Sequence, residues 1–146
     1  MGLMPPTLLL LAMLLMVLLH LVVSLAEPVP GAWRLAGGIL LALGLFLNLA
    51  AERAMKSAGT PVRPSARTTT LLTVGVYART RNPMYLGMLA ILAGLGLLLG
   101  SLSPWIVPPV FAGLIQVRFV WAEEEKLARA FGTDWQAYAS RVRRWL

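Results

Sequence analysis

The chain contains four long runs of apolar residues, separated by short turns or by charged segments. The first two runs cover 7–26 and 33–51, and the last two cover 83–102 and 105–121. Each run approaches the roughly 20 residues that a helix needs to cross the hydrocarbon core of a bilayer. The pattern therefore predicts an all-α integral-membrane protein, a single domain over 1–146, with four transmembrane helices. The third and fourth runs are joined by only two residues, so we expect them to form a helical hairpin.

The remaining segments are polar, and we expect them on one side of the membrane. Residues 52–82 combine basic side chains with glycine and proline, which indicates a cytoplasmic loop. Residues 122–146 are charged and predict short cytoplasmic helices that break at Gly132, a good residue for ending a helix. The last part of the chain mixes basic and aromatic side chains. This mixture suits either a segment that lies on an anionic leaflet or a plain topology anchor. The residues are Trp135, Tyr138, Arg141, Arg143, Arg144 and Trp145.

Composition supports a membrane protein, with 58% hydrophobic and 13% charged residues and a mean hydropathy of +0.75. The net charge of +7 raises the alternative of nucleic-acid binding. All Lys and Arg residues except Arg34, however, lie in 53–81 or 118–144, beside the apolar runs. That asymmetry is typical of the positive-inside rule and argues against a nucleic-acid partner. It places both termini in the cytoplasm and the chain in an inner or plasma membrane.

Other classes are weighed on the same residues. Small residues at 24–26 resemble a signal-peptide cleavage site, but the basic n-region is missing and the apolar run is too long. The chain has no cysteine, so a thiolate metal site is excluded, and no metal site is predicted. None of the apolar runs contains an acidic residue, which argues against a proton-coupled transporter.

Candidate chemistry gathers at two places in the second half of the chain. Asn82 and Pro83 open the third apolar run, where Asn is a favoured N-cap and Pro suits the first helical position. The backbone N–H groups of a helix start can bind an anion. Three glutamates, Glu123, Glu124 and Glu125, follow the fourth run. Because a hairpin begins and ends at the same membrane level, we expect a site between Asn82 and Glu123.

These motifs resemble those of the isoprenylcysteine carboxyl methyltransferase and phospholipid methyltransferase superfamily of integral-membrane enzymes. The first block of the resemblance reads Thr69-Thr70-Leu71-Leu72, Gly75, Tyr77, Arg81-Asn82-Pro83-Met84-Tyr85 and Gly87. The second block reads Glu123-Glu124, Leu127, Phe131-Gly132, Trp135, Tyr138 and Arg141-Val142-Arg143-Arg144. The likeness covers about 69–144 with its spacing kept. One departure is that Asn82 replaces the histidine of the family pattern.

The resemblance implies a methyl donor, S-adenosylmethionine, bound on the cytosolic side. It implies the following cofactor-binding residues: Thr69, Thr70, Leu71, Leu72, Tyr77, Asn82, Pro83, Met84, Tyr85, Glu123 and Glu124. In the isoprenylcysteine enzymes an arginine one turn before the glutamates meets the substrate carboxylate. That position is Phe119 here and its neighbour is Arg118, so Arg118 is the candidate for orienting the acceptor.

The resemblance predicts an integral-membrane methyltransferase with a lipophilic acceptor that arrives from the bilayer. The acceptor group is a carboxylate, a thiol or a lipid amine headgroup. Two alternatives remain open on the sequence: a membrane sterol-type reductase that uses NADPH, and a non-enzymatic transport or assembly protein. No oligomeric state is predicted.

Overall fold

A computed structural model describes residues 3–23, 30–59 and 70–146, and all secondary structure in these ranges is helical. The expectation of an all-α fold is therefore confirmed for the described residues. The elements in chain order are α1 (Pro5–Val22), α2 (Gly31–Ser57), η1 (Gly75–Ala78), α3 (Pro83–Leu99), η2 (Ser103–Ile106), α4 (Val107–Ile115), η3 (Gln116–Val120) and α5 (Trp121–Arg141). Of these, η1 and η2 are 3₁₀ turns and η3 is a π-helical segment.

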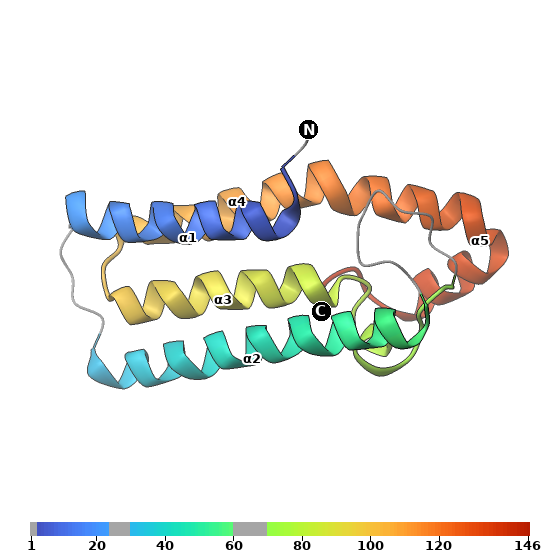
Figure 1. The fold of residues 1–146 in the computed structure, drawn as a ribbon, viewed down its shortest axis with the longest axis horizontal. Helices are drawn as coiled ribbons and strands as arrows, with labels where there is room; N and C mark the ends of the chain where they lie inside the picture. Colours follow the sequence, from blue (N-terminus) through green and yellow to red (C-terminus); the bar gives the residue numbers. More distant parts are fainter. Residues whose placement is uncertain (1–2, 24–29, 60–69) are drawn as a thin grey trace.

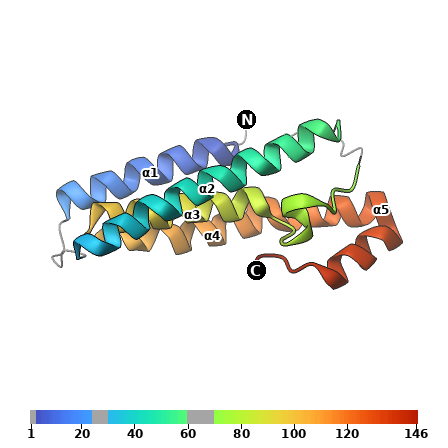
Figure 2. The same ribbon diagram turned by 90° about the horizontal axis from the view of Figure 1, so that it is seen from below.

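The helices α1, α2, α3 and α4 lie side by side and alternate in direction (Figure 1; Figure 2). The start of α1, the end of α2 and the start of α3 lie at one end of the bundle, together with α5 and the C-terminus (Figure 1). The end of α1, the start of α2 and η2 lie at the other end. Segments distant in the sequence therefore meet at the α5 end.

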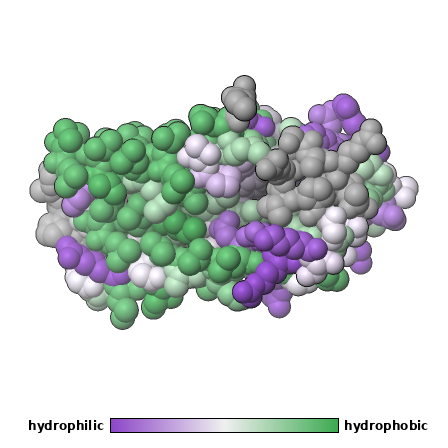
Figure 3. All heavy atoms as spheres, viewed as in Figure 1, coloured by the Kyte–Doolittle hydropathy of each residue, from purple (hydrophilic) through white to green (hydrophobic). Residues whose placement is uncertain are grey.

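Three helices among the described residues are long and apolar enough to cross a membrane: α1, α2 and the continuous helix from Ser103 to Arg141. α3 is also apolar but has only 17 residues, because Pro83 begins it and Gly100 ends it. Gly100 adopts φ 78°, a left-handed conformation that suits glycine at a helix end. In the face drawn in Figure 3, hydrophobic residues cover most of the α1–α4 bundle, and hydrophilic residues gather mainly towards α5.

α2 is longer than the span expected over 33–51. It begins at Gly31 and continues to Ser57, so the segment expected as a loop over 52–82 starts with helix. The charged residues that suggested a loop support the helix instead, because Lys56 and Glu52 form an i,i+4 ion pair of 2.6 Å. The helix thus carries its last turns beyond the apolar run.

The fourth helix continues beyond the apolar run over 105–121, in keeping with the helix expected after it. α4 leads through η3 directly into α5. The break expected at Gly132 is present as a kink, where φ 49° and ψ −114° interrupt the helical geometry. The charged residues from Glu123 onward lie beyond the apolar part of this helix. The kink reverses α5 and brings the tail back to the bundle (Figure 1).

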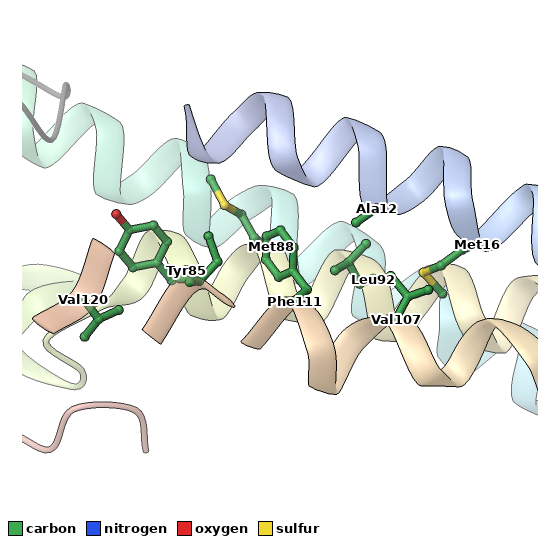
Figure 4. Close-up of a cluster of buried hydrophobic side chains, with 9 residues drawn as sticks. Ala12, Met16, Tyr85, Met88, Leu92, Val107, Phe111 and Val120 are labelled. Atoms are coloured by element: carbon green, nitrogen blue, oxygen red, sulfur yellow. The ribbon is translucent and has the colours of Figure 1, made fainter. Parts of the chain in front are cut away.

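The core lies between α1, α3 and α4, where apolar side chains from all three helices meet (Figure 4). Met16 of α1, Leu92 of α3 and Phe111 of α4 are nearly inaccessible to solvent. At the α5 end of this cluster, Tyr85 and Val120 are labelled side by side, and the Tyr85 hydroxyl marks its polar edge (Figure 4). The apolar core therefore ends where polar side chains begin.

Candidate active site

A cavity of about 360 Å³ lies at the α5 end of the bundle. Its volume is within the range of about 300–1,000 Å³ that is typical of small-molecule sites. Ten of the eleven residues expected to bind a cofactor line it: Thr70, Leu71, Leu72, Tyr77, Asn82, Pro83, Met84, Tyr85, Glu123 and Glu124. Thr69 lies outside the described residues. The fold thus brings together two motifs that are nearly forty positions apart.

The two motifs are joined directly by a hydrogen bond. The Tyr85 hydroxyl, in the first turn of α3, donates to Glu123 Oε1 of α5 at 2.6 Å. Pro83 begins α3, so Tyr85 lies in the first turn of this helix. Both residues are buried. Glu123 lies in the first turn of α5, which continues directly from η3. The contact fixes the start of α3 against the start of α5.

Glu123 is an unusual carboxyl group in this setting. It lies past the apolar part of its helix, yet burial raises its pKa above the ordinary value. The hydrogen bond from Tyr85 and the positive charge of Lys126 act in the opposite direction. A buried carboxylate favours a nearby cation or hydrogen-bond donor, because its own hydration has been removed. This corner of the cavity can therefore bind a positively charged or hydroxyl-bearing group.

Aromatic side chains form another wall of the cavity. The Tyr138 hydroxyl donates to the Tyr77 carbonyl oxygen at 2.7 Å. The Tyr138 and Trp135 rings are 5.8 Å apart between centroids. Burial raises the pKa of Tyr138 to about 12, so the phenol stays protonated and donates this bond at neutral pH. Burial also raises the pKa of Tyr77.

The expectation that Trp135 and Tyr138 face an anionic leaflet is wrong. Only 7% of Trp135 and 3% of Tyr138 is exposed, and both residues line the cavity. The kink at Gly132 turns this part of α5 towards the bundle (Figure 1). Aromatic residues three positions apart lie on one helix face, and this face meets protein rather than lipid.

Asn82 does not cap α3 with its side chain, contrary to expectation. Its Nδ2 donates instead to the Arg144 carbonyl oxygen at 3.1 Å, and the Thr80 hydroxyl donates to the same oxygen at 3.1 Å. The Arg81 backbone N–H donates to the Arg143 carbonyl oxygen at 3.0 Å. We call residues 142–146 the C-terminal tail. The tail holds the turn that opens α3.

Glu124 differs from its neighbour Glu123 in its partners. Arg144 Nη2 donates to Glu124 Oε2 at 2.7 Å, and Arg144 Nε lies 3.0 and 3.1 Å from the two carboxylate oxygens. Arg81 Nη1 lies 3.5 Å from Oε1. The carboxylate is thus bound by two guanidinium groups of the protein itself. Glu124 lines the cavity, but its charge is already compensated.

Arg118 is not among the residues that line the cavity. It lies in η3 with an exposed side chain, whereas its neighbour Phe119 packs near Tyr85 with a ring-centroid distance of 6.4 Å. Successive helical residues point in directions about 100° apart, which separates the two side chains.

Several cavity residues were not among the expected ligands: Met4, Pro5, Pro6, Met55, Arg81, Met88, Lys126, Leu127, Trp135 and Tyr138. The residues from α1 and α2 belong to no recognisable motif, and they reach the cavity only because these helices pack against α3. Arg81 belongs to the arginine–asparagine–proline motif, which is the signal that would have found it. Among the described residues, no three acidic or histidine side chains cluster so as to hold a metal ion.

Comparison with known proteins gives one family. A model of the family described as phospholipid methyltransferase matches residues 33–134, which is more than half of the chain. No curated protein and no solved structure matches the chain. The matched range contains most of α2, the turn that opens α3 and both glutamates of the cavity. The chain therefore belongs to the phospholipid methyltransferase family of integral-membrane methyltransferases.

Proposed function

We propose that the chain transfers a methyl group from S-adenosylmethionine to a lipophilic acceptor, and that the cavity at the α5 end binds the donor. The observation that carries the proposal is the hydrogen bond from Tyr85 to Glu123, which joins the two family motifs in the wall of one cavity. Family membership supports the reaction type. The half-buried Glu123 and the aromatic wall support a cationic nucleoside as the ligand.

The residues around the cavity suit the parts of this donor. Glu123 would accept hydrogen bonds from the ribose hydroxyls or from the ammonium group. The first-turn N–H groups of Met84 and Tyr85 precede the i→i−4 bonds of α3, so they are available to a carboxylate. Leu71, Leu72 and Tyr77 would contact the adenine ring. Glu124 and Asn82 would shape this site while holding the C-terminal tail.

The donor supplies an activated methyl group on sulfur, so the protein has no difficult covalent step to perform. Transfer requires the acceptor nucleophile, the methyl carbon and the sulfur to lie in line, with water excluded. A cavity between α3 and α5, walled by Tyr77, Tyr85 and Trp135, provides such positioning. Glu123 would contribute by fixing the donor, with its orientation set by Tyr85.

The acceptor would reach the cavity from the bilayer. Met4, Met55, Met84 and Met88 all line it, and thioether side chains adapt to apolar groups of different shape. A lipid-like molecule with a carboxylate, a thiol or an amine headgroup fits such a wall. Arg118 lies outside the cavity, so we no longer assign it to the acceptor. We assign α3 as the fourth membrane span, and we place both termini and the cavity on the cytoplasmic side.

The two other classes raised by the sequence are less favoured. A sterol-type reductase would need NADPH, and a transport or assembly protein would need no donor cavity. The family match supports methyl transfer over both.

The test is transfer of labelled methyl groups from S-adenosylmethionine to a total lipid and thiol extract by the detergent-purified protein. We expect label in an organic-soluble product with the wild type and a strong loss with Glu123→Gln. A Glu125→Gln variant serves as control, because Glu125 is exposed and pairs with Arg129. Absence of any labelled product, or protection of the protein from proteolysis by NADPH alone, would overturn the proposal.

A further inference from the structure

Arg81 has a buried guanidinium nitrogen that the protein leaves without a partner. The residue lines the cavity, and only 14% of its side chain is exposed. Among the described residues, its Nε is the buried side-chain nitrogen or oxygen for which no hydrogen-bond partner is present. An unsatisfied buried donor costs about 1–3 kcal/mol. A ligand that brought an acceptor to Arg81 would remove this cost.

The charges around Arg81 also leave an excess of positive charge. Arg144 holds Glu124 with short contacts on both oxygens, and Arg81 approaches the same carboxylate only to 3.5 Å. Two guanidinium groups therefore share one carboxylate. The other acid of the cavity, Glu123, is bonded to Tyr85 and not to an arginine. Within the part of the chain that the structure describes, Arg81 therefore has no carboxylate of its own.

An aromatic ring lies against the guanidinium of Arg81. The Arg81 Cζ atom lies 5.6 Å from the centroid of the Trp135 ring. Stacking on an aromatic face holds a guanidinium in place while its N–H groups stay free in its own plane. A preorganised guanidinium of this kind favours a bidentate carboxylate or phosphate.

We propose that Arg81 is an anion-binding residue of the cavity and, beside the first-turn N–H groups of α3, takes a carboxylate or phosphate group of a bound substrate. The inference rests on the proposed function and adds to it. Glu123 attracts the cationic part of a ligand and Arg81 the anionic part, so the cavity orients a zwitterion. Two sources fit this chemistry: the amino-acid end of the methyl donor, and the phosphate of a lipid headgroup.

The test compares two donors that differ by a single group. Decarboxylated S-adenosylmethionine keeps the ammonium and the sulfonium but lacks the carboxylate. Calorimetry would measure the binding of both donors to the wild type, Arg81→Met and Arg81→Lys. Arg79→Met is the matched control, because Arg79 lies two residues away with an exposed side chain. Thermal melting would show that each variant is folded.

If the anion is the donor carboxylate, Arg81→Met weakens S-adenosylmethionine roughly tenfold or more and leaves the decarboxylated donor unchanged. Arg81→Lys restores part of the affinity, since it keeps the charge but not the planar fork. If the anion is a lipid phosphate, both donors bind as before, and the KM for a phospholipid acceptor rises while kcat is kept. Arg79→Met changes neither quantity.

Equal weakening of both donors would overturn the proposal, since it indicates a structural role for Arg81. No change in donor affinity or in acceptor KM would also overturn it. If Arg81→Met does not fold, the same comparison is made with Arg81→Lys. An Arg81→Lys variant with the wild-type preference for the carboxylated donor and the wild-type acceptor KM would contradict the proposal. Failure of the wild type to bind either donor would instead contradict the proposed function.

Discussion

At the scale of single residues, two adjacent glutamates have different environments. Glu123 is bonded to the neutral phenol of Tyr85, whereas Glu124 is bonded to two arginines. The difference arises because consecutive helical positions point about 100° apart. One side chain meets the start of α3 and the other meets the C-terminal tail. We therefore assign ligand binding to Glu123 and a structural role to Glu124.

We expect Glu123→Gln to stabilise the ligand-free protein at neutral pH. Burial raises the pKa of Glu123, so the folded state binds its proton more tightly than the unfolded state does. Stability conferred by that proton is present at acidic pH and is lost as the pH rises through the raised pKa. Glutamine carries no charge at any pH and can still accept the hydrogen bond from Tyr85. The melting temperature of the variant should then exceed that of the wild type at pH 8.

The measurement is thermal melting in detergent between pH 4 and pH 8. The advantage of Glu123→Gln should shrink as the pH falls towards the ordinary glutamate value. Glu125→Gln is the control, because Glu125 is exposed and pairs with Arg129 of its own helix. A constant offset between wild type and Glu123→Gln at all pH values would contradict the assigned burial.

At the scale of elements, glycines allow α2 and α3 to pack at backbone distance. A Cβ atom added at Gly44 would lie 2.5 Å from the Gly87 carbonyl oxygen and 2.8 Å from the Ile91 backbone nitrogen. Gly37 meets the carbonyl oxygen of Gly94 in the same way, at 2.8 Å. These contacts repeat along both helices every seven residues. Small residues of this kind are typical of close helix pairs in membranes.

We predict that Gly44→Ala destabilises the protein by about 1–3 kcal/mol, the usual cost of overpacking. The added methyl group meets backbone atoms, which cannot move without separating α2 from α3. Gly38→Ala is the control, because nothing lies within 4 Å of a Cβ at Gly38. The melting temperature should fall for the first variant and stay equal or rise for the second. Equal melting temperatures would argue against the close contact.

The C-terminal tail is the second element with a specific role. It contacts the turn that opens α3 through the backbone of Arg143 and Arg144. It also reaches η3, where Trp145 Nε1 donates to Gln116 Oε1 at 3.1 Å. The tail thus connects the beginning of α3 to the end of the α4 helix.

We expect Arg144→Ala to lower stability by about 1 kcal/mol, a modest value because the arginine is partly exposed. It should also weaken donor binding, since Glu124 loses its ion pair with the Arg144 side chain, and the tail whose Arg144 carbonyl accepts from Asn82 is then held less firmly. Arg141→Ala is the matched control, because its side chain is exposed and, among the described residues, its hydrogen bond is to the Ala137 carbonyl of its own helix. Melting and calorimetry would compare the two variants. Equal melting temperatures and equal donor affinities of the two variants would show that the C-terminal tail does not support the site.

At the scale of the whole molecule, the sequence predicts the meeting of Asn82, Tyr85 and Glu123, because a hairpin returns to its starting level. It does not predict the contact between Asn82 and Arg144, because a short tail without periodicity gives no sign of its direction. Trp135 and Tyr138 were expected to face a membrane surface but line the cavity. An amphipathic sequence pattern shows that one helix face is apolar, not whether that face meets lipid or protein. The charges of α2 at Glu52 and Lys56 suggested a loop, although their spacing supports a helix.

The proposed orientation of the bundle predicts a labelling pattern in intact cells. The native chain has no cysteine, so a single introduced cysteine is the only thiol. Leu102→Cys lies at the η2 end, where Leu102 is 55% exposed, and Ser140→Cys lies on an exposed position of α5. A membrane-impermeant maleimide should label the first variant and not the second. Labelling of Ser140→Cys alone would reverse the orientation.

The most direct test of the whole account is calorimetric titration of the detergent-purified protein with S-adenosylmethionine. We predict one binding site in the wild type. We expect a loss of roughly tenfold to hundredfold in affinity for Glu123→Gln, as for a lost charge-assisted hydrogen bond, and no loss for Glu125→Gln. No binding by the wild type, or equal affinity of all three proteins, would contradict the claim that α3 and α5 together form a methyl-donor site.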